Sequence, residues 1–260
     1  MTKAQERARA RRRYEKVQAK QARKAADAAR FRRVLAVLGV VAVVAAGLAV
    51  LGFKLSKVDP APAVNAAGCQ APPRSLGTGA QLTLPDKASA EGKTFTAVLT
   101  TNCGDITMEL DGTKAPQAVA SFVQLANENY WLNAPCHRVV RSTAMTVLQC
   151  GDPTGTGQGG PGYGFGVENP PADGTYERGT VAMARTSDPQ QGNGGQFFIV
   201  DAKTSLPDPN GYTVFGKVVA GLDIVDRIVA EGAAGGNGAT DGAPAAPISI
   251  LRVAVTEKKA

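Results

Sequence analysis

The run Gly194-Gly195-Gln196-Phe197-Phe198-Ile199-Val200 determines how the rest of this 260-residue sequence is interpreted. Phe, Ile and Val favour extended backbone, because branched and aromatic side chains pack well on a pleated surface. The two glycines in front of them mark a boundary, so the pattern predicts a β-strand at residues 196–200. On this pattern alone Phe198 belongs to the core of a sheet.

Short segments of the same type lie on both sides of this run. The further strand candidates are Phe95–Thr101, Ile106–Leu110, His137–Val140, Met145–Gln149, Thr180–Ala184, Thr213–Val219 and Ile248–Val255. One helix is indicated after Pro116 and another by apolar residues at helical spacing between Leu222 and Val229. Many short strands, two helices and long Gly-rich loops predict a mainly β fold, a closed antiparallel barrel capped by two helices.

The N-terminal part of the chain has a different character. Residues 34–53 form a run of 20 residues without a charge, long enough as a helix to cross the hydrocarbon core of a bilayer. We therefore expect a single-pass transmembrane helix at 34–53. Residues 1–33 hold 13 of the 29 Lys and Arg and only 3 acids, which predicts a basic cytoplasmic tail. A cleaved signal peptide, or lipidation at Cys69, is the alternative.

The remaining chain is close to neutral, so its partners need not be polyanions and no nucleic-acid binding is expected. Residues 54–93 are rich in Pro, Ala, Gly, Ser and Thr, which predicts a flexible linker in front of a domain at 94–260. Anchored in this way, the domain is expected at the cell membrane on its extracytoplasmic side.

Four cysteines, Cys69, Cys103, Cys136 and Cys150, contain no CxxC pair. With one histidine in the chain, a Cys/His zinc site is not expected. In an oxidising compartment the four thiols can form two disulfides in three connectivities, and buried free thiols are the alternative.

Two motifs that suggest other chemistry fail on context. Gly155-Thr156-Gly157-Gln158-Gly159-Gly160 satisfies G-x-G-x-x-G, but Pro161 and further glycines follow where a dinucleotide site needs a helix. The sole histidine, His137, lies in a strand candidate, and no serine stands in a G-x-S-x-G elbow. Neither a nucleotide cofactor nor hydrolase chemistry is therefore expected, and His137 is interpreted as structural.

Several blocks, in order and at similar spacing, resemble the signature segments of cyclophilins over about residues 95–257. They are Cys136-His137-Arg138-Val139-Val140, Leu148-Gln149-Cys150-Gly151-Asp152, Arg178-Gly179-Thr180-Val181-Ala182-Met183-Ala184, the run at 194–200, and Tyr212-Thr213-Val214-Phe215-Gly216-Lys217-Val218-Val219. The resemblance implies an eight-stranded antiparallel closed barrel capped by two helices. It also implies peptidyl-prolyl cis–trans isomerase activity on proline-containing unfolded polypeptides, without metal or organic cofactor.

The same resemblance assigns roles to particular residues. It implies that Arg138 is catalytic, that Gln149 holds the substrate carbonyl or orients Arg138, and that Phe198 is the apolar floor for the proline ring. The other implied substrate-binding residues are Met183, Ala184, Gln196, Leu206, Tyr212, Val147 and Thr146.

The sequence departs from the family pattern in several places. Thr146 and Val147 stand where the family carries an aromatic residue and a methionine, and three residues are inserted between Arg138 and Gln149. Ser205 stands at the tryptophan of drug-sensitive members, and Tyr212 at the pocket histidine. Losing aromatic walls weakens proline packing, so we expect reduced activity on small peptides and weak or no cyclosporin binding. A tethered prolyl-peptide binding module or holdase, or a scaffold built on the basic tail, is the alternative function.

Overall fold

The computed structural model describes residues 63–235 and 239–259, together with residues 16, 20, 23, 24, 30–32, 35, 36 and 39, which are helical. The chain divides into two units, Met1–Ala61 and Pro62–Ala260. Within the described residues, no helix combines the length and the apolar character that a membrane crossing requires. Apart from residues 35, 36 and 39, the expected transmembrane segment 34–53 lies outside the described part of the chain.

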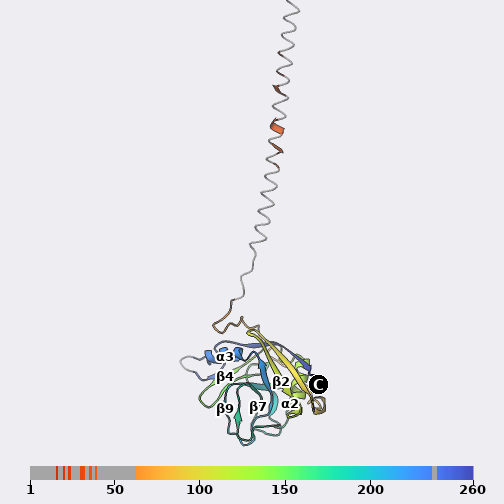
Figure 1. The fold of residues 1–260 in the computed structure, drawn as a ribbon, viewed down its shortest axis with the longest axis vertical. Helices are drawn as coiled ribbons and strands as arrows, with labels where there is room; N and C mark the ends of the chain where they lie inside the picture. The colour runs from red at the N-terminus through yellow and green to blue at the C-terminus, as the bar shows by residue number, and fades with distance from the viewer. Residues whose placement is uncertain are drawn as a thin grey trace, which may run out of the picture. The chain divides into compact units, whose positions relative to one another are not determined.

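The second unit is built on one antiparallel sheet (Figure 1). The order of its strands is β11-β4-β5-β8-β7-β10-β2-β1-β12-β3. Their bounds are β1 (Thr94–Thr101), β2 (Gly104–Asp111), β3 (Ala134–Pro135), β4 (Arg138–Arg141), β5 (Thr146–Cys150), β7 (Thr180–Arg185), β8 (Asn193–Ala202), β10 (Val214–Ala220), β11 (Asp241–Gly242) and β12 (Ser249–Glu257). Two short strands, β6 (Thr175–Tyr176) and β9 (Thr204–Ser205), form a separate pair.

The expected mainly β fold with few helices is confirmed, and each of the eight strand candidates corresponds to one strand. The closed ring of hydrogen bonds is not observed. The order instead begins at β11 and ends at β3, and these two strands do not pair within the described residues. Both are only two residues long, too short for a periodic pattern to reveal them.

The two ends of the strand order are nevertheless joined through the chain. β3 pairs with β12, and β4 pairs with β5. Only Cys136 and His137 separate β3 from β4. One short segment therefore connects the two ends of the strand order. Arg138 therefore begins its strand directly after the junction.

Two helices cover the large core on the inner side of the sheet. α2 (Pro116–Asn127) begins with a proline, and the carboxylate of Glu168 accepts hydrogen bonds from the backbone N–H groups of Gln117 and Ala118. This carboxylate satisfies two donors that a helix N-terminus leaves free. Phe122 of α2 packs against Trp131, Phe197 and Phe215. α3 (Leu222–Glu231) buries Ile224, Val225, Ile228 and Val229.

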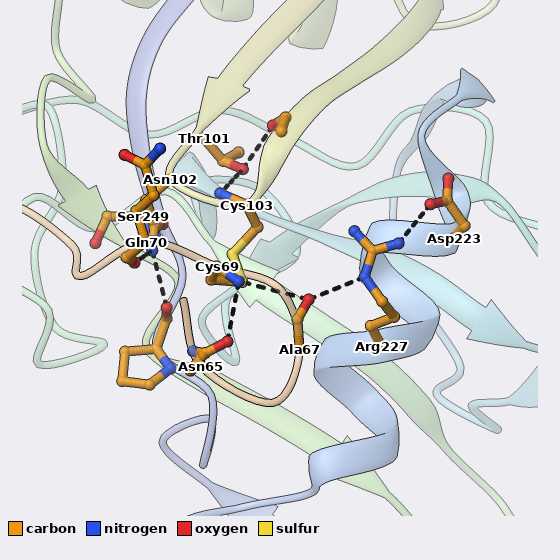
Figure 2. Close-up of a disulfide and its surroundings, with 12 residues drawn as sticks. Asn65, Ala67, Cys69, Gln70, Thr101, Asn102, Cys103, Asp223, Arg227 and Ser249 are labelled. Atoms are coloured by element: carbon orange, nitrogen blue, oxygen red, sulfur yellow. Dashed lines mark hydrogen bonds and ion pairs between the residues drawn. A yellow bond between two sulfur atoms is a disulfide. The ribbon is translucent and has the colours of Figure 1, made fainter. Parts of the chain in front are cut away.

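Residues 63–93, expected as part of a flexible linker, lie against the domain. A disulfide joins Cys69 to Cys103, and the Nε of Arg227 on α3 donates to the carbonyl of Ala67 over 2.9 Å (Figure 2). The side-chain amide of Asn102 donates to the carbonyl of Gln70 over 2.7 Å. Composition alone predicted a tether. On the side of residues 63–93 these contacts are made by backbone carbonyls and one cysteine, which leave no pattern in the composition. A short 3-10 helix, η1 (Lys87–Ser89), lies in the same segment.

Candidate active site

Strands β4, β5, β8 and β7 carry two separate sets of apolar side chains, because neighbours along a strand point to opposite faces. Val139, Leu148 and Ile199 belong to the large core. The opposite face carries a smaller group, which we call the outer cluster. It consists of Val140, Val147, Tyr176, Ala182, Phe198 and Val200, with Met145, Ala184, Leu206, Tyr212 and Val214 half-buried against it.

Strand register places charged, polar and aromatic residues side by side on this face. Arg138 of β4 pairs with Gln149 of β5, and Gln149 pairs with Phe198 of β8. Phe198 in turn pairs with Ala182 of β7. Directly opposite residues in a sheet have neighbouring side chains, so these four strands place Arg138, Gln149, Phe198 and Ala182 in one row across the same face.

The polar side chains form a continuous chain of hydrogen bonds. The Nη1 of Arg138 donates to the Oε1 of Gln149 over 3.3 Å, and the Nε2 of Gln149 donates to the Oε1 of Gln196 over 3.0 Å. The Nε2 of Gln196 donates to the carbonyls of Gly157 and Gly159, each over 3.0 Å. The Gly-rich loop that resembled a dinucleotide motif thus supplies carbonyl acceptors that orient the two glutamines.

Three aromatic rings make up much of the outer cluster. The ring of Phe198 lies edge-on to those of Tyr212 and Tyr176, at centroid distances of 5.8 and 6.2 Å. The rings of Tyr176 and Tyr212 are also 6.2 Å apart and edge-on. Such T-shaped pairs are favourable beyond the area they bury, so Phe198 is held from two sides.

A cavity of about 460 Å³ lies beside the glutamines. It is lined by Gln149, Gln196, the loop at 157–161 and residues 184–186 and 191–195, with Tyr163. Most of the lining residues are glycines or residues with an amide side chain, and Arg185 and Tyr163 also contribute.

Most of the residues implied by the resemblance meet here. Arg138, Val147, Gln149, Ala184, Gln196, Phe198, Leu206 and Tyr212 lie in the outer cluster, on the cavity wall or in the polar chain that borders them.

Met183 was expected to bind substrate, but the structure does not bring it into this group. It is 3% exposed and packs in the large core. Ala182 and Ala184, its neighbours on β7, contact the outer cluster, so alternation turns Met183 inward.

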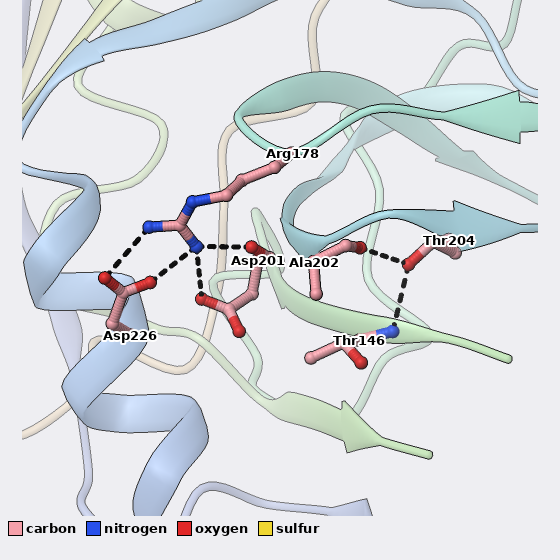
Figure 3. Close-up of polar contacts among 6 residues, drawn as sticks. All are labelled: Thr146, Arg178, Asp201, Ala202, Thr204 and Asp226. Carbon is pink, nitrogen blue, oxygen red and sulfur yellow. Dashed lines mark hydrogen bonds and ion pairs between the residues drawn. The ribbon is translucent and has the colours of Figure 1, made fainter. Parts of the chain in front are cut away.

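Thr146 also lies apart from the outer cluster. A register shift falls between Thr146 and Val147. The backbone N–H of Thr146 donates to the hydroxyl of Thr204 over 3.0 Å (Figure 3). Thr146 lines another cavity, of about 700 Å³, with Arg141, Asp201 and Asp226.

Asp241 contacts Arg138, although no sequence pattern marks it as a site residue. The Nε and Nη2 of Arg138 donate to the two carboxylate oxygens of Asp241, each over 2.7 Å. The hydrogen bond from Arg138 holds the pKa of Asp241 below its usual value. The two residues are 103 positions apart in a Gly- and Ala-rich context, so no local pattern could have joined them.

Arg185 was also missed as a contact of the site. Its side chain is 3% exposed, and its guanidinium carbon lies 4.9 Å from the centroid of the Tyr212 ring. The Nε donates to the carbonyl of Gly211 over 2.8 Å, and the Nη2 bonds to Asp208. Arg185 thus supports the segment that carries Tyr212.

The open question of the cysteines is resolved in favour of two disulfides, Cys69–Cys103 and Cys136–Cys150. The second lies beside the site, since Cys136 precedes Arg138 by two residues and Cys150 follows Gln149. His137, between Cys136 and Arg138, is half-buried, and burial lowers its pKa. The imidazole is therefore neutral at neutral pH.

Comparison with known proteins agrees with this geometry. The family model of cyclophilin-type peptidyl-prolyl cis-trans isomerases/CLD matches residues 96–255. A probable peptidyl-prolyl cis-trans isomerase B of Mycobacterium tuberculosis is 37% identical over 201 residues, which cover 72% of this chain and 63% of that protein. The chain thus spans less than two thirds of the length of this relative. A peptidyl-prolyl cis-trans isomerase of Helicobacter pylori is 40% identical over 139 residues, covering 52% of this chain and 81% of that one.

A solved structure gives the same result. The crystal structure of a cyclophilin-type peptidyl-prolyl cis-trans isomerase of Cryptosporidium parvum in the presence of the dipeptide Ala-Pro has a TM-score of 0.52 at 30% identity. It covers 63% of this chain and 99% of that one. With the family model matching more than half of its residues, this chain belongs to the cyclophilin-type peptidyl-prolyl cis-trans isomerase family.

Proposed function

We propose that the Pro62–Ala260 unit accelerates cis–trans rotation about X-Pro peptide bonds, with Arg138 as the donor to the prolyl nitrogen. The observation that carries the proposal is the connection of Arg138 to Phe198 through Gln149, which pairs with both residues and accepts a hydrogen bond from the guanidinium. Membership of the family supports the reaction, and this geometry supports the residues.

Rotation about a peptide bond is slow because twisting removes amide resonance, at a barrier of about 18–20 kcal/mol. In the twisted state the prolyl nitrogen becomes pyramidal and gains a lone pair. A donor aimed at that lone pair is stabilising only in the transition state, which is the condition for catalysis. No proton is transferred and no nucleophile is needed, so a guanidinium that stays charged at all relevant pH values is suited to the task.

In this proposal each group has one task. The proline ring packs on Phe198, with Val147, Leu206 and Tyr212 at its edges. The flanking peptide lies along Gln149 and Gln196, whose orientation the loop carbonyls fix. Apolar packing then holds the ring still while the bond in front of it turns.

The test is isomerisation of an X-Pro peptide by the full-length chain, followed by NMR exchange or a protease-coupled assay. We expect Arg138→Ala to lower kcat/KM by about 100-fold, a typical loss for one transition-state donor. Arg141→Ala is the matched control, because it removes the same charge from the same strand at an exposed position. Equal rates for Arg138→Ala and the wild type would refute the role of Arg138.

A second function, a prolyl-peptide binding module with weak catalysis, is favoured by one observation. Thr146 and Ser205 stand where the family pattern has aromatic residues, and neither contributes to the outer cluster, so two aromatic walls are missing. If the folded wild-type chain gives no acceleration but binds an X-Pro peptide by titration calorimetry, this alternative holds.

For location, we propose an extracytoplasmic domain that meets exported, unfolded chains, anchored by residues 34–53. Two independent features support this. Paired cysteines in the described unit are typical of an oxidising compartment, and 13 basic residues precede the charge-free run. In intact cells, added protease should digest residues 62–260; full protection of the domain until lysis would contradict this orientation.

A further inference from the structure

Asp241 contacts the guanidinium of Arg138 in a two-pronged arrangement. Both carboxylate oxygens accept, one from Nε and one from Nη2, each over 2.7 Å. A guanidinium and a carboxylate in this geometry define one relative orientation, which a single hydrogen bond does not.

The backbone holds Asp241 in place independently of this ion pair. Strand β11 pairs Asp241 with Val140 and Gly242 with Val139. The backbone N–H of Arg141 donates to the carbonyl of Thr240 over 2.7 Å. Further backbone bonds, from Ala234 to Ala243 and from Ala245 to Gly232, tie this segment to the end of α3. The carboxylate is thus presented to Arg138 by a fixed support.

The remaining donors of Arg138 are thereby restricted. A guanidinium has five N–H groups. Asp241 takes two of them and Gln149 takes one, on Nη1. Among the described residues, one N–H on Nη1 and one on Nη2 have no acceptor, and the Nε–H is not available to a substrate.

We propose that Asp241 is a positioning residue for the isomerase reaction, which holds Arg138 in one rotamer with its Nη edge presented to the prolyl nitrogen. This inference rests on the proposed role of Arg138. Arg138 and Asp241 are both substantially exposed, at 38% and 51% of their side chains. Exposed pairs add little to folding stability. The main effect of this pair is therefore to restrict the side-chain conformations of the arginine, whose conformational entropy is among the largest of any residue.

The experiment compares isomerisation kinetics of the full-length wild type with four variants, Arg138→Ala, Asp241→Ala, Asp241→Asn and Asp223→Ala, on one X-Pro peptide. Asp241→Ala should lower kcat by about tenfold and leave KM within about twofold, because misplacing a catalytic group affects the transition state more than the bound ground state. Asp241→Asn should lie between this variant and the wild type, since an amide has one acceptor oxygen instead of two. The control is Asp223→Ala, which removes the same charge from a pair with Arg227 on α3.

A spectroscopic readout separates positioning from a purely structural role. In the wild type, the Nε–Hε resonance of Arg138 should be protected from solvent exchange, with and without peptide. In Asp241→Ala the protection should be lost, while the urea midpoint of unfolding stays that of Asp223→Ala. If Asp241→Ala does not fold, the near-isosteric Asp241→Asn carries the test.

The outcomes distinguish the two proposals. If Arg138→Ala loses activity but Asp241→Ala keeps kcat within twofold of the wild type, the positioning role is overturned and the catalytic role of Arg138 stands. A rise in kcat in Asp241→Ala also overturns it, because the carboxylate then withholds Arg138 from the substrate. If Arg138→Ala keeps its activity, the catalytic role fails first.

Discussion

At the scale of single residues, the wall of the outer cluster depends on Arg185. Its side chain is buried, and its donors go to Gly211, Asp208 and Thr186. Gly211 and Asp208 lie between Leu206 and Tyr212, so one cation fixes the segment that carries both. Its guanidinium lies over the Tyr212 ring, where a cation–π contact adds to the attraction. Tyr212 therefore serves as a rigid wall beside Phe198.

The wall can be tested through peptide affinity. Tyr212→Ala should weaken binding of an X-Pro peptide by about 1 kcal/mol, roughly fivefold, because it removes an edge-to-face aromatic partner of Phe198. Tyr212→Phe keeps the ring and should bind like the wild type. Titration calorimetry measures both, and equal affinities for the Ala and Phe variants would contradict the role of the ring.

Ser205 gives a second residue-scale prediction. It is exposed at the end of β9 and adjoins Leu206 of the outer cluster. The wild type should bind cyclosporin weakly, and Ser205→Trp should tighten binding by about tenfold, through apolar area added next to that cluster. Ser205→Ala is the control. Inhibition of the wild-type chain at a stoichiometric drug concentration would contradict the prediction.

These residues also show how far sequence reasoning reaches. Arg138, Gln149 and Phe198 were assigned to the site through resemblance, since each alone resembles an ordinary strand residue. The resemblance assigned Met183 to the substrate site, whereas the structure packs it in the large core, because alternation along a strand prevents it from sharing a face with Ala184. Asp241 could not be found at all, because its contact depends on a fold that brings β11 onto β4.

At the scale of elements, α3 is tied to the sheet by a small charged group (Figure 3). The Nη1 and Nη2 of Arg178 donate to the two oxygens of Asp226 on α3, over 2.7 and 2.9 Å. The same Nη1 also bonds to the carbonyl and the carboxylate of Asp201 at the end of β8. Burial raises the pKa of Asp201 to about 6, and the hydrogen bond with Asp226 is the second cause of this rise.

This pKa predicts how stability changes with pH. Because the folded-state pKa of Asp201 lies above its usual 3.8, the contribution of this group is fully present below about pH 4 and is lost as pH rises through 6. Asp201→Asn should therefore be more stable than the wild type at pH 8, by roughly 1–3 kcal/mol, and the difference should shrink towards pH 4. Urea unfolding at several pH values measures it.

The partner carboxylate gives the opposite sign and serves as the control. The hydrogen bond from Arg178 lowers the pKa of Asp226, so its contribution is present above its usual pKa and is lost as pH falls. Asp226→Asn should be destabilised at pH 7 and approach the wild type at pH 3. Two variants with the same pH dependence would show that the charged group does not act as described.

The disulfide Cys136–Cys150 constrains β4 and β5 where Arg138 and Gln149 pair. Replacing both cysteines by serine should lower the unfolding free energy by about 3 kcal/mol, the chain-entropy value for a loop of about 15 residues. It should also lower kcat/KM, because the register of the two strands sets the Arg138–Gln149 contact. Urea unfolding and the isomerase assay measure these effects. Unchanged activity with lowered stability would limit the disulfide to a structural role.

At the scale of the whole molecule, the domain includes residues 63–93 in addition to the region of strands that begins at Thr94. The eight longer strands and the helices α2 and α3 could be predicted, because alternating and helical periodicities mark them, whereas the two-residue strands could not. Residues 63–93 have no such period, and their place on the domain is fixed by contacts with distant groups. Ser75 donates to the carbonyl of Pro153 over 2.7 Å, and Gln81 to that of Gly160 over 3.2 Å. The segment thereby reaches the loop that lines the cavity beside the glutamines.

Because residues 63–93 contact this loop, we expect their removal to lower the isomerase activity. A fragment 94–260 loses the Cys69–Cys103 disulfide, worth about 3–4 kcal/mol for a loop of this length. It also loses the bonds to Pro153 and Gly160, so the carbonyls of Gly157 and Gly159 that orient Gln196 are held less firmly. The fragment should thus be less stable than residues 63–260 and have a lower kcat/KM.

The full-length chain with Cys69→Ser and Cys103→Ser should lose stability but keep its activity, because its contacts to the loop remain. Equal activity of the two fragments would show that residues 63–93 support the fold without supporting the site.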